Sequence, residues 1–471
     1  MNRCWTKKHE YRRPDSTSRA FRYGDADGLP PGRRHWAAAA IGISACLSII
    51  DGSLLNVALP TIARDFSVSP AESILVVNAY QLTVSVGLLP LAALGSVIGY
   101  RRLNQGGLVL FLVATIGCAA APSFFLLTCA RAFQGLGAAA IMSVSTALIR
   151  QTYPARMLGR GIGFNTMTVA ASSAAGPALA GLILSVASWH WLFVLSVPLG
   201  LAALAIGART LPEPVRSAGK CDWMSAVLTV WSMGAFLTSV NAGSHDLAPW
   251  AIYAAFTLAL AGGMLLVRRE RRSANPTFPL DLLRKPVIAL SVSTSMCSFI
   301  SQMLTLVSLP FLLSGAGLSA SEIGFAVMSW PLAIALIAPI AGRLADRWPA
   351  GILGGLGLLL TSSAMLLLDV LPAPTRVIDV MWRMGLCGAG TIIFQAPNIR
   401  LIVRSAPVHR SAAAGGLVAT VRVTGQTIGA ALAALVFRMA PAGDGHPMRI
   451  AAAFVGAAAL LSFSRMLLVV E

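Results

Sequence analysis

An aspartate lies in the middle of the apolar segment ACLSIIDGSLLNVALP, which spans residues 45–60. Placing a charged side chain at the centre of a membrane costs about 3 kcal/mol or more, so residues of this kind usually serve a function. A second charge, Arg131, lies near the start of another apolar segment, 124–149. The proton affinity of a carboxyl group depends on its burial and on nearby cations. Asp51 and Arg131 are therefore candidates for coupling proton binding to a second event.

The two charges fall at similar depths if their segments are helices that cross a membrane in opposite directions. From the helical rise per residue, Asp51 lies about 14 Å and Arg131 about 10 Å from the same face. Two alternatives remain open. Asp51 can form a permanent ion pair that only holds two helices together, and Arg131 can be a hydrogen-bonding hub for backbone carbonyls and Gln134.

The composition indicates a membrane protein. Of 471 residues, 56% are hydrophobic and 11% are charged, whereas soluble proteins contain about 25% charged residues. The net charge is +18, but the Arg and Lys residues lie mostly in short segments between apolar runs, with few aromatics among them. This pattern argues against nucleic-acid binding and is typical of membrane orientation signals. The cysteines are scattered, without a C-x-x-C pair, and give no sign of a metal or redox site.

Several apolar segments have the length of about 20 residues that a membrane-spanning helix needs. They lie at 36–60, 73–96, 103–121, 124–149, 161–185, 190–209, 223–241, 249–267, 287–313, 322–345, 351–370, 377–399, 411–437 and 449–468. The sequence therefore predicts an all-α polytopic membrane protein with about fourteen transmembrane helices.

The distribution of basic residues between these segments predicts the orientation of the chain. One set of loops and helix ends is rich in them and includes Arg101, Arg102, Arg150, Arg160, Arg343, Arg347, Arg400 and Arg404. The alternate set is poor and holds Arg64, Arg376, Arg438 and Arg449. We expect the rich side and both termini to be cytoplasmic, with the protein integral to the plasma membrane, which is the inner membrane of a bacterium.

An internal repeat divides the chain into two halves. The turn ALGSVIGYRR (93–102) follows the second predicted helix, AGRLADRWPAG (341–351) follows the tenth, and Arg131 has a counterpart in Arg383. Repeats of this kind build central binding sites in transporters. The predicted organisation is a disordered cytoplasmic tail at 1–35, a six-helix half at 36–210, two inserted helices with flanking loops at 211–272, and a second six-helix half at 273–471.

Several motifs resemble those of the major facilitator superfamily, specifically its fourteen-helix drug:proton antiporters. IDGSLLNVALP (50–60), RAFQGLGAAA (131–140), AAGPALAG (174–181) and SWHWLFVLSVPLG (188–200) are similar to that family's signatures in four helices of its first half. PLDLLRKPVIALSVSTSMCSF (279–299), WRMGLCGAG (382–390) and RVTGQTIGAAL (422–432) are similar to the methyl viologen resistance exporters. The resemblance covers nearly all of the chain after residue 35.

The resemblance implies a major facilitator fold with two six-helix halves and two extra central helices. It also implies a secondary transporter that exports lipophilic or quaternary cations, such as drugs, biocides or methyl viologen, in exchange for protons. The halves would rock around a central cavity, with Asp51 and Arg131 in proton coupling. The alternative is a facilitator of another small metabolite, either proton-independent or proton-coupled. The dependence of transport on a proton gradient distinguishes the proton-independent facilitator from the exporter.

A group of polar and aromatic residues is the candidate lining of the substrate cavity. Aromatic side chains can stack on a lipophilic cation, although core packing is the simpler role for them. Arg383 and Arg422 can instead satisfy backbone carbonyls or pair with Asp379 and Gln426. The candidates are Asn56, Tyr80, Gln81, Gln134, Phe299, Trp330, Arg383, Gln395, Arg422 and Gln426.

A second group is predicted to control the conformational change. The Gly-Pro pair at 176–177 should bend its helix, since proline removes a backbone donor, and small neighbours let another helix approach; plain packing is the alternative. The family's cytoplasmic turn carries Asp followed by Arg, but the first copy here has Ser96 and Val97, while the second keeps Asp346 and Arg347. The group consists of Ser96, Gly99, Arg101, Arg102, Gly176, Pro177, Gly181, Gly342, Asp346 and Arg347.

The sequence predicts neither an enzyme nor a cofactor or metal site. It contains no G-x-x-x-x-G-K-[ST] nucleotide-binding loop. It also lacks the cluster of His, Asp, Glu or Cys at one membrane face that an integral-membrane enzyme or sensor would need. We expect the proton gradient to drive transport, and the partners to be small cations, protons and membrane lipid rather than nucleic acid. We expect a monomer.

Overall fold

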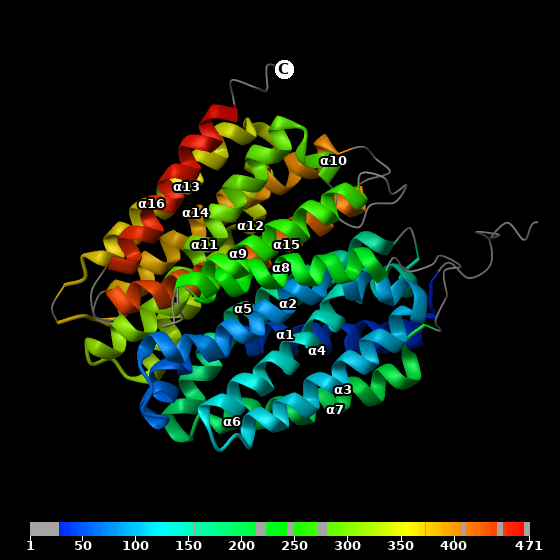
Figure 1. Ribbon diagram of the computed structural model, residues 1–471, viewed down its shortest axis with the longest axis horizontal. Helices are drawn as coiled ribbons and strands as arrows, with labels where there is room; N and C mark the ends of the chain where they lie inside the picture. The colour runs from blue at the N-terminus through cyan, green and yellow to red at the C-terminus, as the bar shows by residue number, and fades with distance from the viewer. Residues whose placement is uncertain are drawn as a thin grey trace, which may run out of the picture.

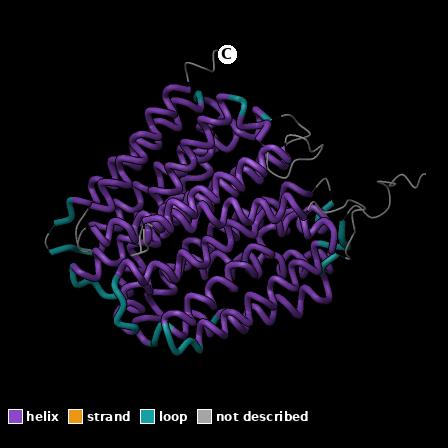
Figure 2. Tube along the Cα trace, in the orientation of Figure 1, coloured by secondary structure: helices purple, strands orange, loops and turns teal. Residues whose placement is uncertain are grey.

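The computed structural model describes residues 28–154, 157–212, 223–242, 249–270, 280–372, 374–406, 411–439 and 446–465. Regular structure in these ranges is entirely helical (Figure 2). A helix satisfies its backbone hydrogen bonds within one segment, which hydrocarbon requires of a chain that crosses it. The all-α membrane class predicted from the apolar segments therefore agrees with the structure.

The first half begins with a long helix and ends with a broken one. Its helices are α1 (Pro31–Asp65), α2 (Pro70–Ile98), α3 (Tyr100–Ala119), α4 (Phe124–Thr152), α5 (Leu158–Val186), α6 (His190–Val194) and α7 (Ser196–Thr210). The predicted tail at 1–35 ends too late, because residues 31–35 already form the first turn of α1. Residues 1–27 of that tail lie outside the described residues.

Two helices follow before the second half. They are α8 (Trp223–Ala242) and α9 (Pro249–Glu270). The second half contains α10 (Leu280–Leu283), α11 (Pro286–Gly315), α12 (Ala320–Arg347), α13 (Ala350–Asp369), α14 (Val377–Ser405), α15 (Ser411–Met439) and α16 (His446–Ser464). Of the loops predicted to flank α8 and α9 within 211–272, residues 213–222, 243–248 and 271–272 lie outside the described residues.

The predicted count of fourteen membrane spans is not confirmed. Within the described residues, 12 helices are long and apolar enough to cross a membrane, with α6 and α7 together forming one span, His190–Thr210. α8 and α9 occupy two of the predicted spans, 223–241 and 249–267, but are not among the 12. They pack against each other across the front of the molecule in Figure 1, and α8 also contacts α2 and α15. The structure thus supports 12 spans and an additional helix pair.

The internal repeat is visible in local structure. α2 and α12 both begin with a capping box, formed by Ser69 with Glu72 and by Ser319 with Glu322, at positions 250 residues apart. A capping box satisfies two of the free backbone donors at a helix start. The helices that precede them also match, since α1 contains Pro60 and α11 contains Pro310 near the same ends. Equivalent sequence signals therefore build equivalent helices in the two halves (Figure 1).

The two halves contact each other through α5 with α12 and through α2 with α15. The contact between α5 and α12 is tightest where α5 ends and α12 begins. A Cβ atom added at Gly181 would lie 2.7 Å from the carbonyl oxygen of Ala320, and one at Gly324 would lie 2.4 Å from that of Pro177. Only glycine permits this approach of two backbones. α12 has no buried residue between 331 and 340.

We predict that Gly181→Val weakens the contact between the halves. The added side chain would overlap the backbone of α12, and overpacking of this kind costs about 1–3 kcal/mol. The midpoint of thermal unfolding in detergent should fall by several degrees. Gly342→Val is the matched control, because it makes the same change in helix propensity where no atom lies within 4 Å of the new Cβ. Equal midpoints for the two variants would contradict this description of the interface.

Candidate functional site

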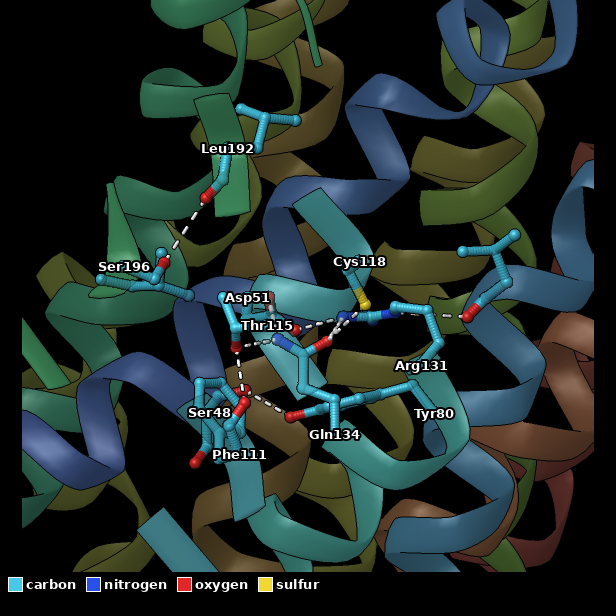
Figure 3. A network of polar contacts seen from close by, with 12 residues as sticks. Ser48, Asp51, Tyr80, Phe111, Thr115, Cys118, Arg131, Gln134, Leu192 and Ser196 are labelled. Atoms are coloured by element: carbon cyan, nitrogen blue, oxygen red, sulfur yellow. Dashed lines mark hydrogen bonds and ion pairs between the residues drawn. The ribbon is translucent and has the colours of Figure 1, made fainter. Parts of the chain in front are cut away.

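Asp51 and Arg131 meet inside the first half of the molecule. A guanidinium nitrogen of Arg131, on α4, donates directly to a carboxylate oxygen of Asp51, on α1. Both residues are buried, with 2% of Asp51 and none of Arg131 exposed. The matching depths inferred from the sequence therefore correspond to direct contact (Figure 3).

Gln134 completes the hydrogen bonding around this ion pair. It follows Arg131 by one helical turn on α4, and its Oε1 atom accepts from Arg131 at 2.6 Å. Its Nε2 atom donates to the second carboxylate oxygen of Asp51 at 3.0 Å and to Thr115 on α3 at 2.8 Å. The Cys118 thiol donates to the same Oε1 at 3.7 Å. Each polar atom of Gln134 thus has a partner, as buried polar networks require.

Aromatic rings cover the guanidinium of Arg131. Its Cζ atom lies 4.3 Å from the ring centroid of Tyr80 on α2 and 5.9 Å from that of Phe193 on α6. A cation over an aromatic face is attracted by the electrons of the ring. The Tyr80 hydroxyl donates to the carbonyl of Ser48 on α1 at 2.8 Å. Residues from five helices therefore hold one buried charge pair.

Sequence reasoning missed two members of this network, Thr115 and Cys118. Both lie on α3, three residues apart and hence on one helical face. A threonine within the apolar segment 108–119 is a weak signal for such a role. Cys118 is buried and is also a hydrogen-bond donor to the site.

The candidate cavity residues lie on several helices of both halves. Tyr80 and Gln134 belong to the ion-pair network, and Gln81 is buried beside Tyr80 on α2. Asn56 is buried on α1, and its Oδ1 atom has no hydrogen-bond partner within the described part of the chain. Trp330 is buried on α12 and its Nε1 atom likewise lacks a partner there.

The remaining candidates lie in the second half. Phe299 packs against α15, since a Cβ at Gly425 would lie 2.9 Å from the Cβ of Phe299. Arg383 donates to the backbone carbonyl of Asp379 at 2.6 Å and lies 3.9 Å from its carboxylate, as the alternative role predicted. The part-exposed candidates are Gln395, Arg422 and Gln426. Among the described residues no hydrogen bond joins the side chains of Arg422 and Gln426, so that predicted pairing is absent there.

The gating candidates of the first half make separate contacts. Ser96 donates to the carbonyl of Ala93 in its own helix at 2.7 Å. Gly99 joins α2 to α3 with φ of 98°, a conformation that favours glycine. Arg101 donates to the carbonyl of Ala208 on α7, and Arg102 is exposed.

The other gating candidates lie along α5 and α12. Gly176 is tightly packed, because a Cβ there would lie 1.9 Å from the hydroxyl of Ser53 on α1. Pro177 lies within α5, which runs as one helix through it. Asp346 forms its ion pair with Arg400 on α14, whereas Arg347 is exposed. The aspartate of this turn therefore pairs with an arginine of a different helix.

We predict that Arg131→Met destabilises the protein strongly, because it leaves Asp51 buried without its cation. Removing one partner of a buried ion pair costs about 3–5 kcal/mol. The double variant Asp51→Asn/Arg131→Met should recover most of the loss, since neither charge then remains. The measurement is the midpoint of thermal unfolding in detergent for the single and double variants. A double variant as unstable as the sum of its single changes would argue against direct coupling of the pair.

Comparison with known proteins places the chain in a family. The family model described as the Major Facilitator Superfamily matches residues 41–430 and, in a second match, 290–471. The chain is 45% identical to the "Uncharacterized transporter YebQ" of Escherichia coli (strain K12), over 91% of this chain and 95% of that protein. It is 31% identical to the "Multidrug resistance protein Stp" of Mycobacterium tuberculosis (strain CDC 1551 / Oshkosh), over 83% of this chain and 74% of that protein.

A solved structure shares the fold. A POT family transporter in complex with 5-aminolevulinic acid superposes with a TM-score of 0.71 at 14% identity, over 92% of this chain and 96% of that chain. At this identity the likeness concerns the arrangement of helices alone. Together with the two matching halves and the membrane-spanning helices, these findings show that the chain belongs to the Major Facilitator Superfamily, a family of membrane transporters rather than enzymes.

Proposed function

We propose that the protein is a secondary active transporter that exports lipophilic or quaternary cations in exchange for protons. In this proposal it lies in the bacterial inner membrane with both termini in the cytoplasm. It works as a monomer and needs no cofactor, because the proton gradient drives transport. The observation that carries the proposal is the buried pair of Asp51 and Arg131, an ionisable carboxylate and its cation inside a membrane-spanning bundle.

Proton exchange at Asp51 depends on its partners. Arg131 and Gln134 donate to its two carboxylate oxygens, and these contacts compensate its charge. When a conformational change lengthens them, an unpaired carboxylate inside the membrane is costly, and protonation is the less costly outcome. When a cationic substrate or Arg131 approaches again, the proton leaves. Binding of a cation and binding of a proton thereby oppose each other, which is the requirement for exchange.

The pair is close to the surface along which the halves contact each other. Ser53, two residues after Asp51 on α1, contacts Gly176 of α5, and α5 packs against α12 of the other half. On the other side, α2 carries both Tyr80 of the network and Ser85, whose hydroxyl lies 3.3 Å from that of Thr424 on α15. A rocking movement of the halves would therefore move α1, which holds Asp51, and α2, which covers Arg131.

The substrate class rests on similarity and on chemistry. The relative named Multidrug resistance protein Stp and the resemblance to methyl viologen resistance exporters both favour drug-like cations. The buried aromatic residues Phe299 and Trp330 offer faces on which a lipophilic cation could stack once the halves open. In this proposal α8 and α9 also cross the membrane, which gives the fourteen spans of the drug:proton antiporters.

We predict that a cation substrate dissipates a proton gradient in inverted membrane vesicles that contain the wild-type protein. Methyl viologen or a quaternary ammonium dye is added, and a pH-sensitive dye reports the gradient. Asp51→Asn should abolish the response, because an amide cannot carry the proton. Asp369→Asn is the control, since Asp369 is a half-buried acid paired with an arginine, Arg449 at 2.7 Å, and it lies at a helix end. Protein amounts are matched by immunoblot.

Two results would contradict this proposal. A full response of the Asp51→Asn vesicles would show that Asp51 is not the proton carrier. Absence of a response by the wild type to every cation would remove the assigned substrate class. Uptake of a metabolite that persists after nigericin collapses the pH gradient would instead favour the proton-independent facilitator.

A further inference from the structure

A strongly basic cavity lies within the second half, apart from the Asp51 network. Its volume is about 540 Å³, and it lies where α12 ends, α13 begins and α14 ends, with Arg465 directly after α16. The charged residues that line it are Asp346, Arg347, Arg400, Arg404 and Arg465. The remaining lining is apolar or small apart from Trp348, which is half-exposed.

The positive charges of this cavity are not balanced within the described residues. Asp346 is its one carboxylate and forms an ion pair with Arg400. The other three arginines, Arg347, Arg404 and Arg465, have no carboxylate within ion-pair distance in the described ranges. Arg347 and Arg404 are exposed, so their guanidinium groups are free to reach a ligand. A cluster of this kind attracts anions and repels a cationic transport substrate.

Arg465 is the base of the cavity and is only 1% exposed. Its hydrogen bonds go to neutral groups, namely the Ser291 hydroxyl at 2.9 Å, the Asn398 amide oxygen and the Ser462 hydroxyl. Burial lowers the pKa of this arginine to about 10, so it is still charged at neutral pH. A buried cation held only by neutral partners is costly, and an anion in the adjoining cavity would compensate it.

The N-terminus of α13, which carries a partial positive charge, also lines the cavity. Ala350 and Gly351, the first residues of this helix, are part of the lining. The preceding Pro349 makes no side-chain cap, so the first backbone N–H groups of α13 lack a capping acceptor. Such groups, together with the helix dipole, favour phosphate and other anions. The arginine guanidinium matches the geometry of phosphate oxygens with paired donors.

We propose that this cavity is a binding site for a phosphate group, supplied either by the headgroup of an anionic phospholipid or by free phosphate. Arg347 and Arg404 contact the phosphate oxygens. The first turn of α13 donates its backbone N–H groups, and the buried Arg465 adds a positive charge at the wall of the cavity. The site is independent of proton exchange at Asp51. Since it joins the ends of α12, α13 and α14, an occupant would hold these three ends together.

The experiment measures thermal unfolding of the full-length protein at constant salt in three conditions. These are nanodiscs of phosphatidylcholine alone, nanodiscs with added phosphatidylglycerol, and phosphatidylcholine nanodiscs with inorganic phosphate. The wild type is compared with Arg404→Gln and Arg347→Gln/Arg404→Gln, both at exposed positions. Arg150→Gln is the matched control, because Arg150 is an exposed arginine in the last turn of α4, the counterpart of α14 in the first half.

We expect the wild type and Arg150→Gln to gain several degrees in the midpoint with one of the two phosphate sources. The double variant should lose this gain, and its apparent affinity should be about tenfold weaker or more, since each charge-assisted hydrogen bond contributes about that factor. A gain with phosphatidylglycerol alone identifies a lipid headgroup, and a gain with inorganic phosphate alone identifies a free anion. No gain in the wild type, or equal gains in the wild type and the double variant, would overturn the proposal.

Discussion

The ion pair between Asp51 and Arg131 is the interaction on which the first half of the molecule depends. Neither residue could remain charged inside a membrane alone, so α1 and α4 must bring them together and α2, α3 and α6 must cover them. The requirement extends to Gln134, which satisfies both charges at once. A buried pair of this kind is weak evidence for stability, because well-packed apolar residues often do as well. In the function proposed above, this pair serves instead as a charge that changes during transport.

The two halves share a fold but not this chemistry. The position in α11 that matches Asp51, 250 residues later, is Ser301, and its hydroxyl donates to the carbonyl of Cys297 in its own helix. Arg383, the counterpart of Arg131, therefore lacks an acid on α11 and contacts Asp379 on its own helix. The second half instead buries Arg465 near its arginine-rich end, among neutral partners. The repeat thus builds one scaffold twice, and the proposed proton site occurs in one copy.

The sequence predicted contacts best for residue types that are costly to bury. Matching depths of Asp51 and Arg131 predicted a contact that the structure contains, because two membrane-buried charges have few other ways to be compensated. The family and the helical class followed from motifs and apolar lengths. The sequence was less informative where many positions are equivalent: Phe299, Trp330 and Arg422 are plausible cavity residues in any helix, and their assignment stays a prediction. Arg465 was not singled out because it lies near the end of the predicted segment 449–468, where an arginine is typical of a flanking charge.

We propose that binding of a cation and binding of a proton at Asp51 exclude each other. The most direct test is proton release by the purified protein in weakly buffered detergent solution, recorded with a pH-sensitive dye as a quaternary ammonium substrate is added. The account predicts release of a proton on substrate binding by the wild type and none by Asp51→Asn, with binding verified separately by fluorescence. Equal release by the two proteins, or binding by the wild type without release, would contradict it.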